Sequence, residues 1–143
     1  MTVEIRRITE VSDALEEAFA RLMPQLSPRL GAPSREELRR VAGSETGELL
    51  AAVAGERIVG VLTLAWYDAP SGRKAWIEDV VVDAATRGRG IGEALVREAL
   101  ALARREGVAR VMLTSNATRR ASHRLYERMG FVRYETDCFR LDL

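Results

Sequence analysis

The segment 87–92, Arg-Gly-Arg-Gly-Ile-Gly, constrains the fold more than any other part of the sequence, because it joins two different local patterns. The residues before it, 75–83, contain the apolar run Val80-Val81-Val82, which is typical of a strand buried on both faces. The residues after it, 90–106, repeat apolar side chains at helical spacing. A strand that enters a glycine-rich turn and continues as a helix is half of a βαβ unit, so the sequence predicts an α/β domain.

The rest of the chain supplies further strands and helices without repeats or linkers. Helical signals mark residues 12–26, 35–41 and 119–129, the second of them opened by a capping box of Ser34 and Glu37. Runs of β-forming residues mark 3–8, 48–54, 57–67, 108–114, 131–134 and 138–141. The predicted order is β-α-α-β-β-β-α-β-α-β-β, with a mixed, partly parallel central sheet and helices on both faces. We expect one domain over residues 1–143.

Composition excludes several classes of function. With 22 basic and 21 acidic side chains, the net charge of +1 gives no general attraction to nucleic acid or to a membrane surface. The single histidine, His123, and the single cysteine, Cys138, stand in no metal-ligand spacing, so no metal site is expected. No apolar run approaches the roughly 20 residues of a membrane span. The first residues do not form a signal peptide, and the expected compartment is the cytoplasm.

The glycine-rich segment has the features of an anion-binding loop. The first N–H groups of a helix lack helical partners and the helix dipole favours negative charge there, while Arg87 and Arg89 add positive charge. A dinucleotide fingerprint is excluded because Glu93 stands where its third glycine is needed, and a Walker A loop because Gly-Lys-Ser/Thr is missing. A simple tight turn is the remaining alternative. The density of glycine and arginine before so periodic a helix favours a phosphorylated ligand.

Two motifs at this point resemble those of the GNAT N-acetyltransferase superfamily. Arg87, Gly90 and Gly92 match its pattern Arg/Gln-x-x-Gly-x-Gly/Ala in the correct context of strand, loop and helix. A second signature, of the form N-x(4)-A-x(4)-Y-x(3)-G-F, is matched by Asn116, Ala121, Tyr126, Gly130 and Phe131. The order of elements resembles that family over the whole chain, although both motifs lie in its latter half.

The resemblance implies acetyl-coenzyme A as co-substrate, held where two parallel strands splay apart. It further implies that the backbone of Val80 and Val82 pairs with the pantetheine arm, that the amides of the loop hold the pyrophosphate, and that no metal takes part. The cofactor-binding residues expected on this basis are Val80, Val81, Val82, Arg87, Gly88, Arg89, Gly90, Ile91, Gly92 and Asn116.

Acetyl transfer to an amine poses two proton problems. An amine with a pKa near 10.4 is neutral about once in 2,500 molecules at pH 7, so a base must take its proton, and the departing thiolate leaves more readily when an acid protonates it. Tyr126 matches the family tyrosine and is the candidate acid, the alternative being a packing role. Glu78 is the candidate base. Asp79 is its rival, because adjacent strand residues point to opposite faces unless a bulge intervenes.

The expected acceptor is a small-molecule primary amine. The region 23–33 shows no acidic cluster that would suit a polyamine, whereas Arg29 and Arg35 suggest an acceptor that carries a carboxylate or phosphate. A non-catalytic sensor that binds acetyl-coenzyme A is the main alternative to an enzyme, and a nucleic-acid module is disfavoured by the balanced charge. Because many members of the family dimerise through their late strands, the resemblance also allows a homodimer.

Overall fold

The computed structural model describes residues 2–116 and 119–143. The chain divides into two compact units, Met1–Leu113 and Thr114–Leu143. The first unit holds a sheet with its helices. The described residues of the second unit contain one helix, α4 (Arg120–Arg128), and the C-terminal segment. The extent of the domain, 1–143, stays a prediction.

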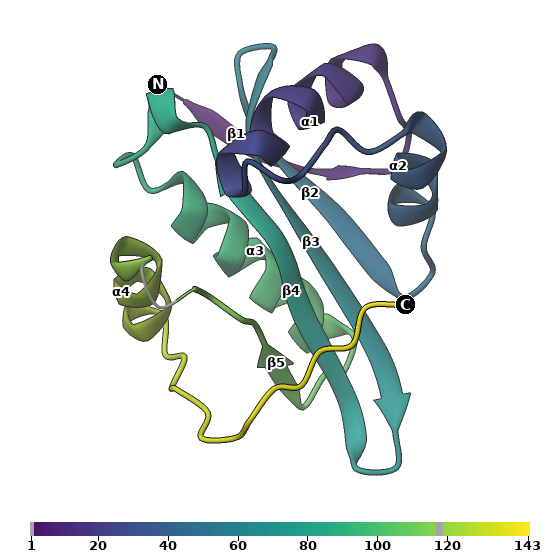
Figure 1. The fold of residues 1–143 in the computed structure, drawn as a ribbon, viewed down its shortest axis with the longest axis vertical. Coiled ribbons are helices and arrows are strands. Elements are labelled where there is room, and N and C mark those ends of the chain that lie inside the picture. Colours follow the sequence, from purple (N-terminus) through teal and green to yellow (C-terminus); the bar gives the residue numbers. More distant parts are fainter. Residues whose placement is uncertain (1, 117–118) are drawn as a thin grey trace. The chain divides into compact units, whose positions relative to one another are not determined.

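The first unit is a five-stranded mixed sheet in the order β1-β2-β3-β4-β5 (Figure 1). Strands β1 to β4 are antiparallel neighbours, and β4 and β5 are parallel, joined by a crossover through α3. The elements of this unit are β1 (Val3–Ile8), α1 (Asp13–Leu26), α2 (Arg35–Ala42), β2 (Gly47–Ala54), β3 (Arg57–Ala69), β4 (Gly72–Val82), the 3-10 turn η1 (Ala84–Thr86), α3 (Ile91–Arg105) and β5 (Arg110–Met112). The predicted mixed, partly parallel sheet is confirmed.

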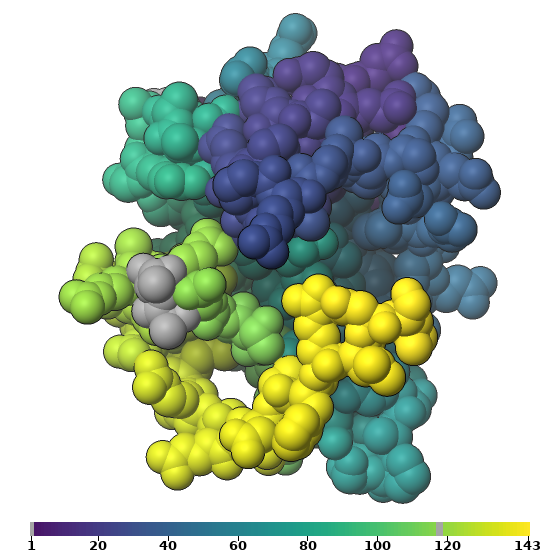
Figure 2. Space-filling model, in the orientation of Figure 1, coloured from purple at the N-terminus to yellow at the C-terminus, as the bar shows by residue number. Residues whose placement is uncertain are grey.

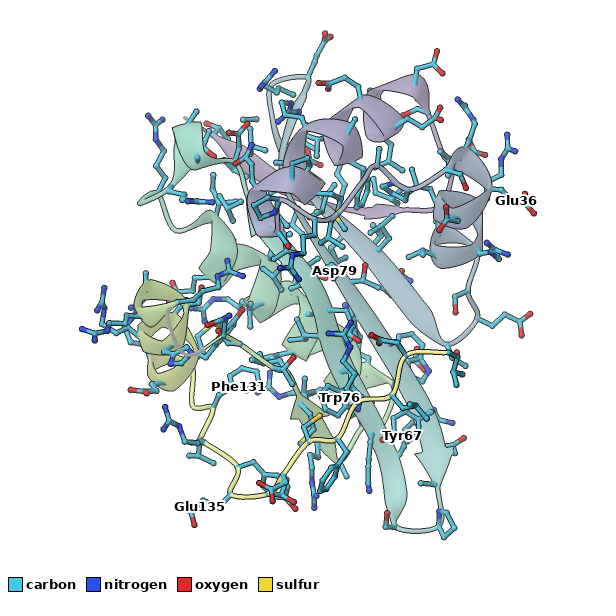
Figure 3. All side chains as sticks on the ribbon, viewed as in Figure 1. Glu36, Tyr67, Trp76, Asp79, Phe131 and Glu135 are labelled. Carbon is cyan, nitrogen blue, oxygen red and sulfur yellow. The ribbon has the colours of Figure 1, made fainter. Side chains whose placement is uncertain are left out.

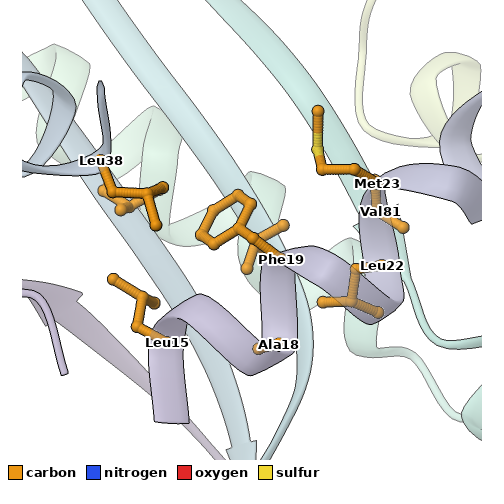
Figure 4. Packing of buried hydrophobic residues seen from close by; sticks show 9 residues of the cluster. Leu15, Ala18, Phe19, Leu22, Met23, Leu38 and Val81 are labelled. Atoms are coloured by element: carbon orange, nitrogen blue, oxygen red, sulfur yellow. The ribbon is translucent and has the colours of Figure 1, made fainter. Parts of the chain in front are cut away.

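Helices cover both faces of the sheet, as predicted. Helix α1 packs Leu15 and Phe19 into one core cluster with Val61 and Val81 of the sheet (Figure 4). On the other face, α3 approaches Gly60 so closely that an added Cβ atom would lie 3.1 Å from Cδ1 of Leu95. Gly60 and Val61 are adjacent on β3 and therefore face opposite sides, which places α1 and α3 on opposite faces.

The local signals for the helices are confirmed in detail. Ser34 and Glu37 form the predicted capping box at the start of α2. The expected apolar stripe of α3 is buried, and Glu93 pairs with Arg97 on its outer side at 3.5 Å. In Figure 2, α1 and α2, coloured purple to blue, form one surface, and the teal end of the β3–β4 hairpin lies away from them.

The two last predicted strands, 131–134 and 138–141, are wrong. Neither range is a strand in the structure, although both carry β-forming side chains. The backbone hydrogen bonds described from this segment are local: Phe131 N–H donates to the carbonyl of Tyr126, and Thr136 N–H to that of Tyr134. A β-strand needs a neighbouring backbone, and β-propensity alone does not supply one. The predicted strand 108–114 is likewise shorter, Arg110–Met112.

Candidate active site

The loop between η1 and α3 presents backbone donors without a side-chain cap. Gly88 and Gly90 have positive φ angles, 80° and 76°, which glycine adopts without strain. Gly90 is the N-cap of α3 and has no side chain to accept from the first turn, whose first helical hydrogen bond runs from Ala94 N–H to the carbonyl of Gly90 at 3.0 Å. The amides of Ile91 and Gly92 precede that bond. The residues present therefore fit a pyrophosphate at this helix end.

Two arginines flank these amides on the surface. Arg87 and Arg89 are both exposed, and Nε of Arg87 donates to the carbonyl of Val82 at 3.3 Å. This hydrogen bond folds the Arg87 side chain back toward the end of β4. Positive charge beside a helix N-terminus strengthens its attraction for a negatively charged group.

The loop is anchored to α1 by a set of hydrogen bonds that local sequence patterns did not predict. Asp83, which is buried, accepts from the N–H of Ala85 at 3.1 Å and from Nη1 of Arg21 at 2.8 Å. Oε1 of Gln25 accepts from the N–H of Ala84 at 2.8 Å. The hydrogen bond from Ala85 and the interactions with Gln25 and Arg21 hold the pKa of Asp83 below its usual value.

Strands β4 and β5 pair over a short stretch only. Their parallel ladder joins Lys74 to Arg110, Ala75 to Val111 and Trp76 to Met112, and β5 ends there. Strand β4 continues to Val82, so residues 77–82 have no partner in this ladder on the β5 side, while β3 pairs with the other side. Val80 and Val82 are half-buried and Val81 is buried, so burial of this run on both faces is not complete.

A β-bulge lies within this part of β4. Val61 of β3 pairs with Val81, but Thr63, two residues further, pairs with Glu78, three residues back. Asp79 and Val80 thus oppose the single residue Leu62, and Asp79 has a φ of 51°. Since Val61 and Thr63 share a face, the bulge puts Glu78 on the α1 side with Val81. Without the extra residue, Glu78 and Val81 would face opposite sides.

The environment of Glu78 suits a base. Partial burial of its carboxyl group raises its pKa, and the negative charge of Asp79 raises it further. Both residues count as exposed, so the carboxylates remain within reach of a small molecule. Figure 3 labels Asp79, which marks the position of the bulge on β4. A carboxyl group whose pKa moves toward neutrality becomes a better general base.

The second unit holds the remaining candidates. Tyr126, half-buried in α4, meets Phe131 edge-on with ring centroids 5.7 Å apart, and burial raises the pKa of its phenol. The carbonyl of Asn116 accepts from the N–H of Arg119 at 2.9 Å and lies 3.0 Å from Nε2 of His123. Because burial raises its pKa, the phenol of Tyr126 stays protonated at neutral pH and can donate a proton.

The structure gives Arg35 a different role from the expected contact with an acceptor. Its guanidinium contacts the carboxylates of Asp13 and Glu16 and donates to the carbonyl of Val11 at 3.0 Å. These bonds tie α2 to the start of α1, so the side chain is engaged within the fold. Arg29 lies on the exposed loop between the two helices.

Metal-ligand clusters and membrane-spanning helices are both absent from the described part of the chain. Residues 2–116 and 119–143 contain no group of three or more His, Cys, Asp or Glu side chains placed to hold a metal ion. Among the same residues, no helix combines the length and apolar character needed to cross a membrane.

The first unit thus combines a mixed α/β sheet, a glycine-rich loop at a βα junction and a carboxylate on a bulged strand. The model of the acetyltransferase (GNAT) family matches residues 11–131, and the chain belongs to this family.

Three similar proteins illustrate the relationship. Glucosamine 6-phosphate N-acetyltransferase 1 of Oryza sativa subsp. japonica is 36% identical over 137 residues, which cover 88% of this chain and 79% of that protein. A transcriptional regulator from Bacillus halodurans C-125 superposes with a TM-score of 0.82 at 28% identity, covering 99% of this chain and 100% of the other. An aminoglycoside acetyltransferase from an uncultured soil metagenomic sample shares the fold. It superposes with a TM-score of 0.85 at 20% identity, over 99% of this chain and 96% of the other. The chain is an N-acetyltransferase of the GNAT type.

Proposed function

We propose that this acetyltransferase moves the acetyl group of acetyl-coenzyme A to a primary amine of a small molecule by direct attack. The observation that carries the proposal is the open edge of β4. This edge, residues 77–82, begins beside Glu78 and ends just before the loop that contains Gly88 and Gly90. The base and the anion-binding amides therefore lie at the two ends of one strand segment. A long, thin carrier can span them.

The cofactor is held mainly by backbone groups in this proposal. Amides from Gly88 to Gly92 bind the pyrophosphate, with Arg87 and Arg89 contributing positive charge. The pantetheine arm lies along the open edge and hydrogen-bonds the backbone of Val80 and Val82. Asn116 is a further candidate for a hydrogen bond to the arm. The positive φ angles of Gly88 and Gly90 support the first assignment, because they turn the backbone into the first turn of α3.

Glu78 takes the proton of the attacking amine. An amine with a pKa near 10.4 is mostly protonated at pH 7, and a protonated nitrogen has no free lone pair. The reaction therefore needs a group that accepts this proton before the C–N bond forms. The raised pKa of Glu78 brings its basicity closer to that of the amine. The bulge supports Glu78 over Asp79, because it places Glu78 on the face where Ala65 and Tyr67 of β3 are exposed.

Tyr126 donates a proton to the departing thiolate of coenzyme A. A phenol whose pKa is raised by burial keeps its proton at pH 7, which supports the role of an acid. Glu78 passes the proton of the ammonium form to solvent, and the nitrogen loses a second proton to solvent once the C–N bond has formed. Tyr126 regains its own proton from solvent, so the reaction releases one proton for each protonated amine consumed. The products are the acetylated amine and free coenzyme A.

The test is coenzyme A release from acetyl-coenzyme A across a panel of amines. The panel contains glucosamine, glucosamine 6-phosphate (the acceptor in the name of the rice relative), hexylamine, ω-aminohexanoate and spermidine. We expect release that depends on one or more of these amines, with formation of the acetylated product by mass spectrometry. Binding of acetyl-coenzyme A without turnover on any amine would instead support a sensor.

A further inference from the structure

The α1 side of the sheet is covered only in part. Along β3, Leu62, Leu64 and Trp66 point toward α3 and are buried, whereas Ala65 and Tyr67 point to the α1 side and are exposed. Strict alternation of this kind marks a strand with one covered and one open face. From Thr63 toward the turn of the β3–β4 hairpin, therefore, the α1 side of β3 and its neighbours forms a surface that no helix of the first unit covers. Glu78, which pairs with Thr63, lies at the end of this surface that is nearest the bulge.

The register of the three strands arranges this surface into rows. One row places Trp76 of β4 between Ala65 of β3 and Met112 of β5. The next places Lys74 between Tyr67 and Arg110. Residues paired across neighbouring strands point to the same face. Figure 3 shows Tyr67 and Trp76 on the adjacent strands β3 and β4.

Two cations stand side by side in the lower row. Lys74, the one lysine of the sequence, and Arg110 are direct neighbours on β4 and β5. None of the ion pairs found among residues 2–116 and 119–143 includes either of them. The carboxylate of Asp68 lies on the opposite face of the hairpin and is bound by Arg73 through Nε at 2.7 Å and Nη2 at 3.1 Å. Adjacent like charges repel, and none of the ion pairs among the described residues offsets the repulsion between these two.

We infer that the acceptor carries an anionic group, which Lys74 and Arg110 bind, while its body lies across Trp76 and Met112 and its amine reaches Glu78. This inference rests on the proposed function and names the substrate class of the same site: a primary amine that also bears a phosphate or a carboxylate. The anion subsite is therefore formed by Lys74 and Arg110 and not by Arg35, which is engaged with Asp13 and Glu16.

The dimensions and chemistry are consistent with such an acceptor. Lys74 and Glu78 are separated by four strand residues, about 13 Å at 3.3 Å per residue. The bulge does not change this distance, because its extra residue comes after Glu78 in the strand. The ring of Trp76 offers a flat apolar surface midway, suited to a sugar ring or an alkyl chain. Arg and Lys both bind phosphate and carboxylate by charge-assisted hydrogen bonds, and a shared anion would relieve the repulsion between them.

The test compares matched acceptors that differ only in the anionic group. Glucosamine 6-phosphate against glucosamine measures preference for a phosphate, and ω-aminohexanoate against hexylamine measures preference for a carboxylate. The quantity is the ratio of kcat/KM within each pair, because a general loss of folded enzyme cancels from a ratio. We expect the native chain to prefer at least one anionic member, and Lys74→Met and Arg110→Met each to lower that preference about ten-fold, mainly through KM, as expected for loss of one charge-assisted contact.

The matched control is Arg104→Met, which removes an exposed cation of α3 on the opposite side of the sheet and should leave the ratio unchanged. Titration calorimetry of the anionic amines in the presence of coenzyme A measures the subsite without turnover, so a failed subsite is distinguishable from a failed reaction. Weaker binding by the double variant Lys74→Met/Arg110→Met supports the inference. Equal binding by the double variant and the native chain, or release of coenzyme A with no preference for either anionic acceptor, overturns it.

Discussion

Arg21 of α1 donates from Nη1 to Oδ2 of Asp83, the residue that follows β4, over 2.8 Å, and from Nη2 to the carbonyl of Ile58 at 2.9 Å. The first bond joins α1 to the residue from which the glycine-rich loop departs, and the second joins α1 to the start of β3. Asp83 is only 5% exposed, so its charge depends on the partners that the fold supplies. The position of the loop is thus set partly by α1.

Arg21→Met should lower the free energy of unfolding by about 2 kcal/mol, because it removes the charge-assisted hydrogen bond to the buried carboxylate of Asp83 and leaves the longer contact with Arg57, at 3.6 Å. Urea denaturation measures the change. Arg97→Met is the matched control, since the pair of Arg97 with Glu93 lies on the exposed side of α3, and its loss should cost less than about 1 kcal/mol. Equal effects of the two substitutions would show that the Arg21–Asp83 pair has no special role.

Gly60→Ala should destabilise the sheet at its contact with α3. The new Cβ atom would lie 3.1 Å from Cδ1 of Leu95 and 3.2 Å from the carbonyl oxygen of Val81, and the latter belongs to backbone that cannot easily move. Overpacking of this kind costs about 1–3 kcal/mol. Gly31→Ala is the control, because open space surrounds that position. A thermal shift of Gly60→Ala no larger than that of Gly31→Ala would contradict the packing described here.

Gly90→Ala should weaken the binding of acetyl-coenzyme A about ten-fold, or about 1.4 kcal/mol. Its φ of 76° is strained for alanine, so the start of α3 would shift and its first amides would lose their alignment. Gly55→Ala introduces similar strain, at φ 63°, in the β2–β3 turn. Both variants should lose comparable stability, but Gly55→Ala should retain affinity. Calorimetric titration with acetyl-coenzyme A measures both affinities. Unchanged affinity of Gly90→Ala would show that the loop takes no part in cofactor binding.

Tyr126→Phe should lower kcat about ten-fold or more, the usual contribution of a general acid, with little change in the affinity for acetyl-coenzyme A. The substitution keeps the ring that packs against Phe131 and removes only the hydroxyl group. Tyr134→Phe is the matched control in the same unit, at an exposed position. If both variants turn over at the native rate, Tyr126 has no part in the proton transfer.

Features that depend on neighbouring residues in the sequence were predicted correctly. The glycines of the loop, the stripe of α3 and the capping box at Ser34 each depend on residues within one or two turns, and all appear as expected. The position of the β-bulge could not be predicted from the sequence, because it is defined by the register between Glu78 and Thr63 on another strand. The Arg21–Asp83 pair joins residues 62 positions apart. The failed strands at 131–141 show the same limit, since propensity cannot supply a neighbouring strand.

The raised pKa of Glu78 also predicts how stability varies with pH. A carboxyl group whose pKa is higher in the folded chain favours folding in its protonated form, and this contribution fades as the pH rises through the folded pKa. At neutral pH, Glu78→Gln should therefore be at least as stable as the native chain. Comparison of urea midpoints at pH 7 checks the sign, and it shows that any loss of rate in this variant does not come from unfolding.

The pH dependence of kcat/KM for Glu78→Gln tests the central claim most directly, namely that the bulge presents this carboxylate to the attacking amine. In the native chain the rate should rise with pH through the pKa of Glu78, because the carboxylate form is the base. Glu78→Gln should be slow at neutral pH and recover partly at alkaline pH, where more of the amine is already neutral. Asp79→Asn, which retains a residue that tolerates positive φ, should keep the rise of the rate with pH, with its midpoint at lower pH because the charge of Asp79 no longer raises the pKa of Glu78. A defect in Glu78→Gln that is the same at every pH, or a larger defect in Asp79→Asn, would contradict the account.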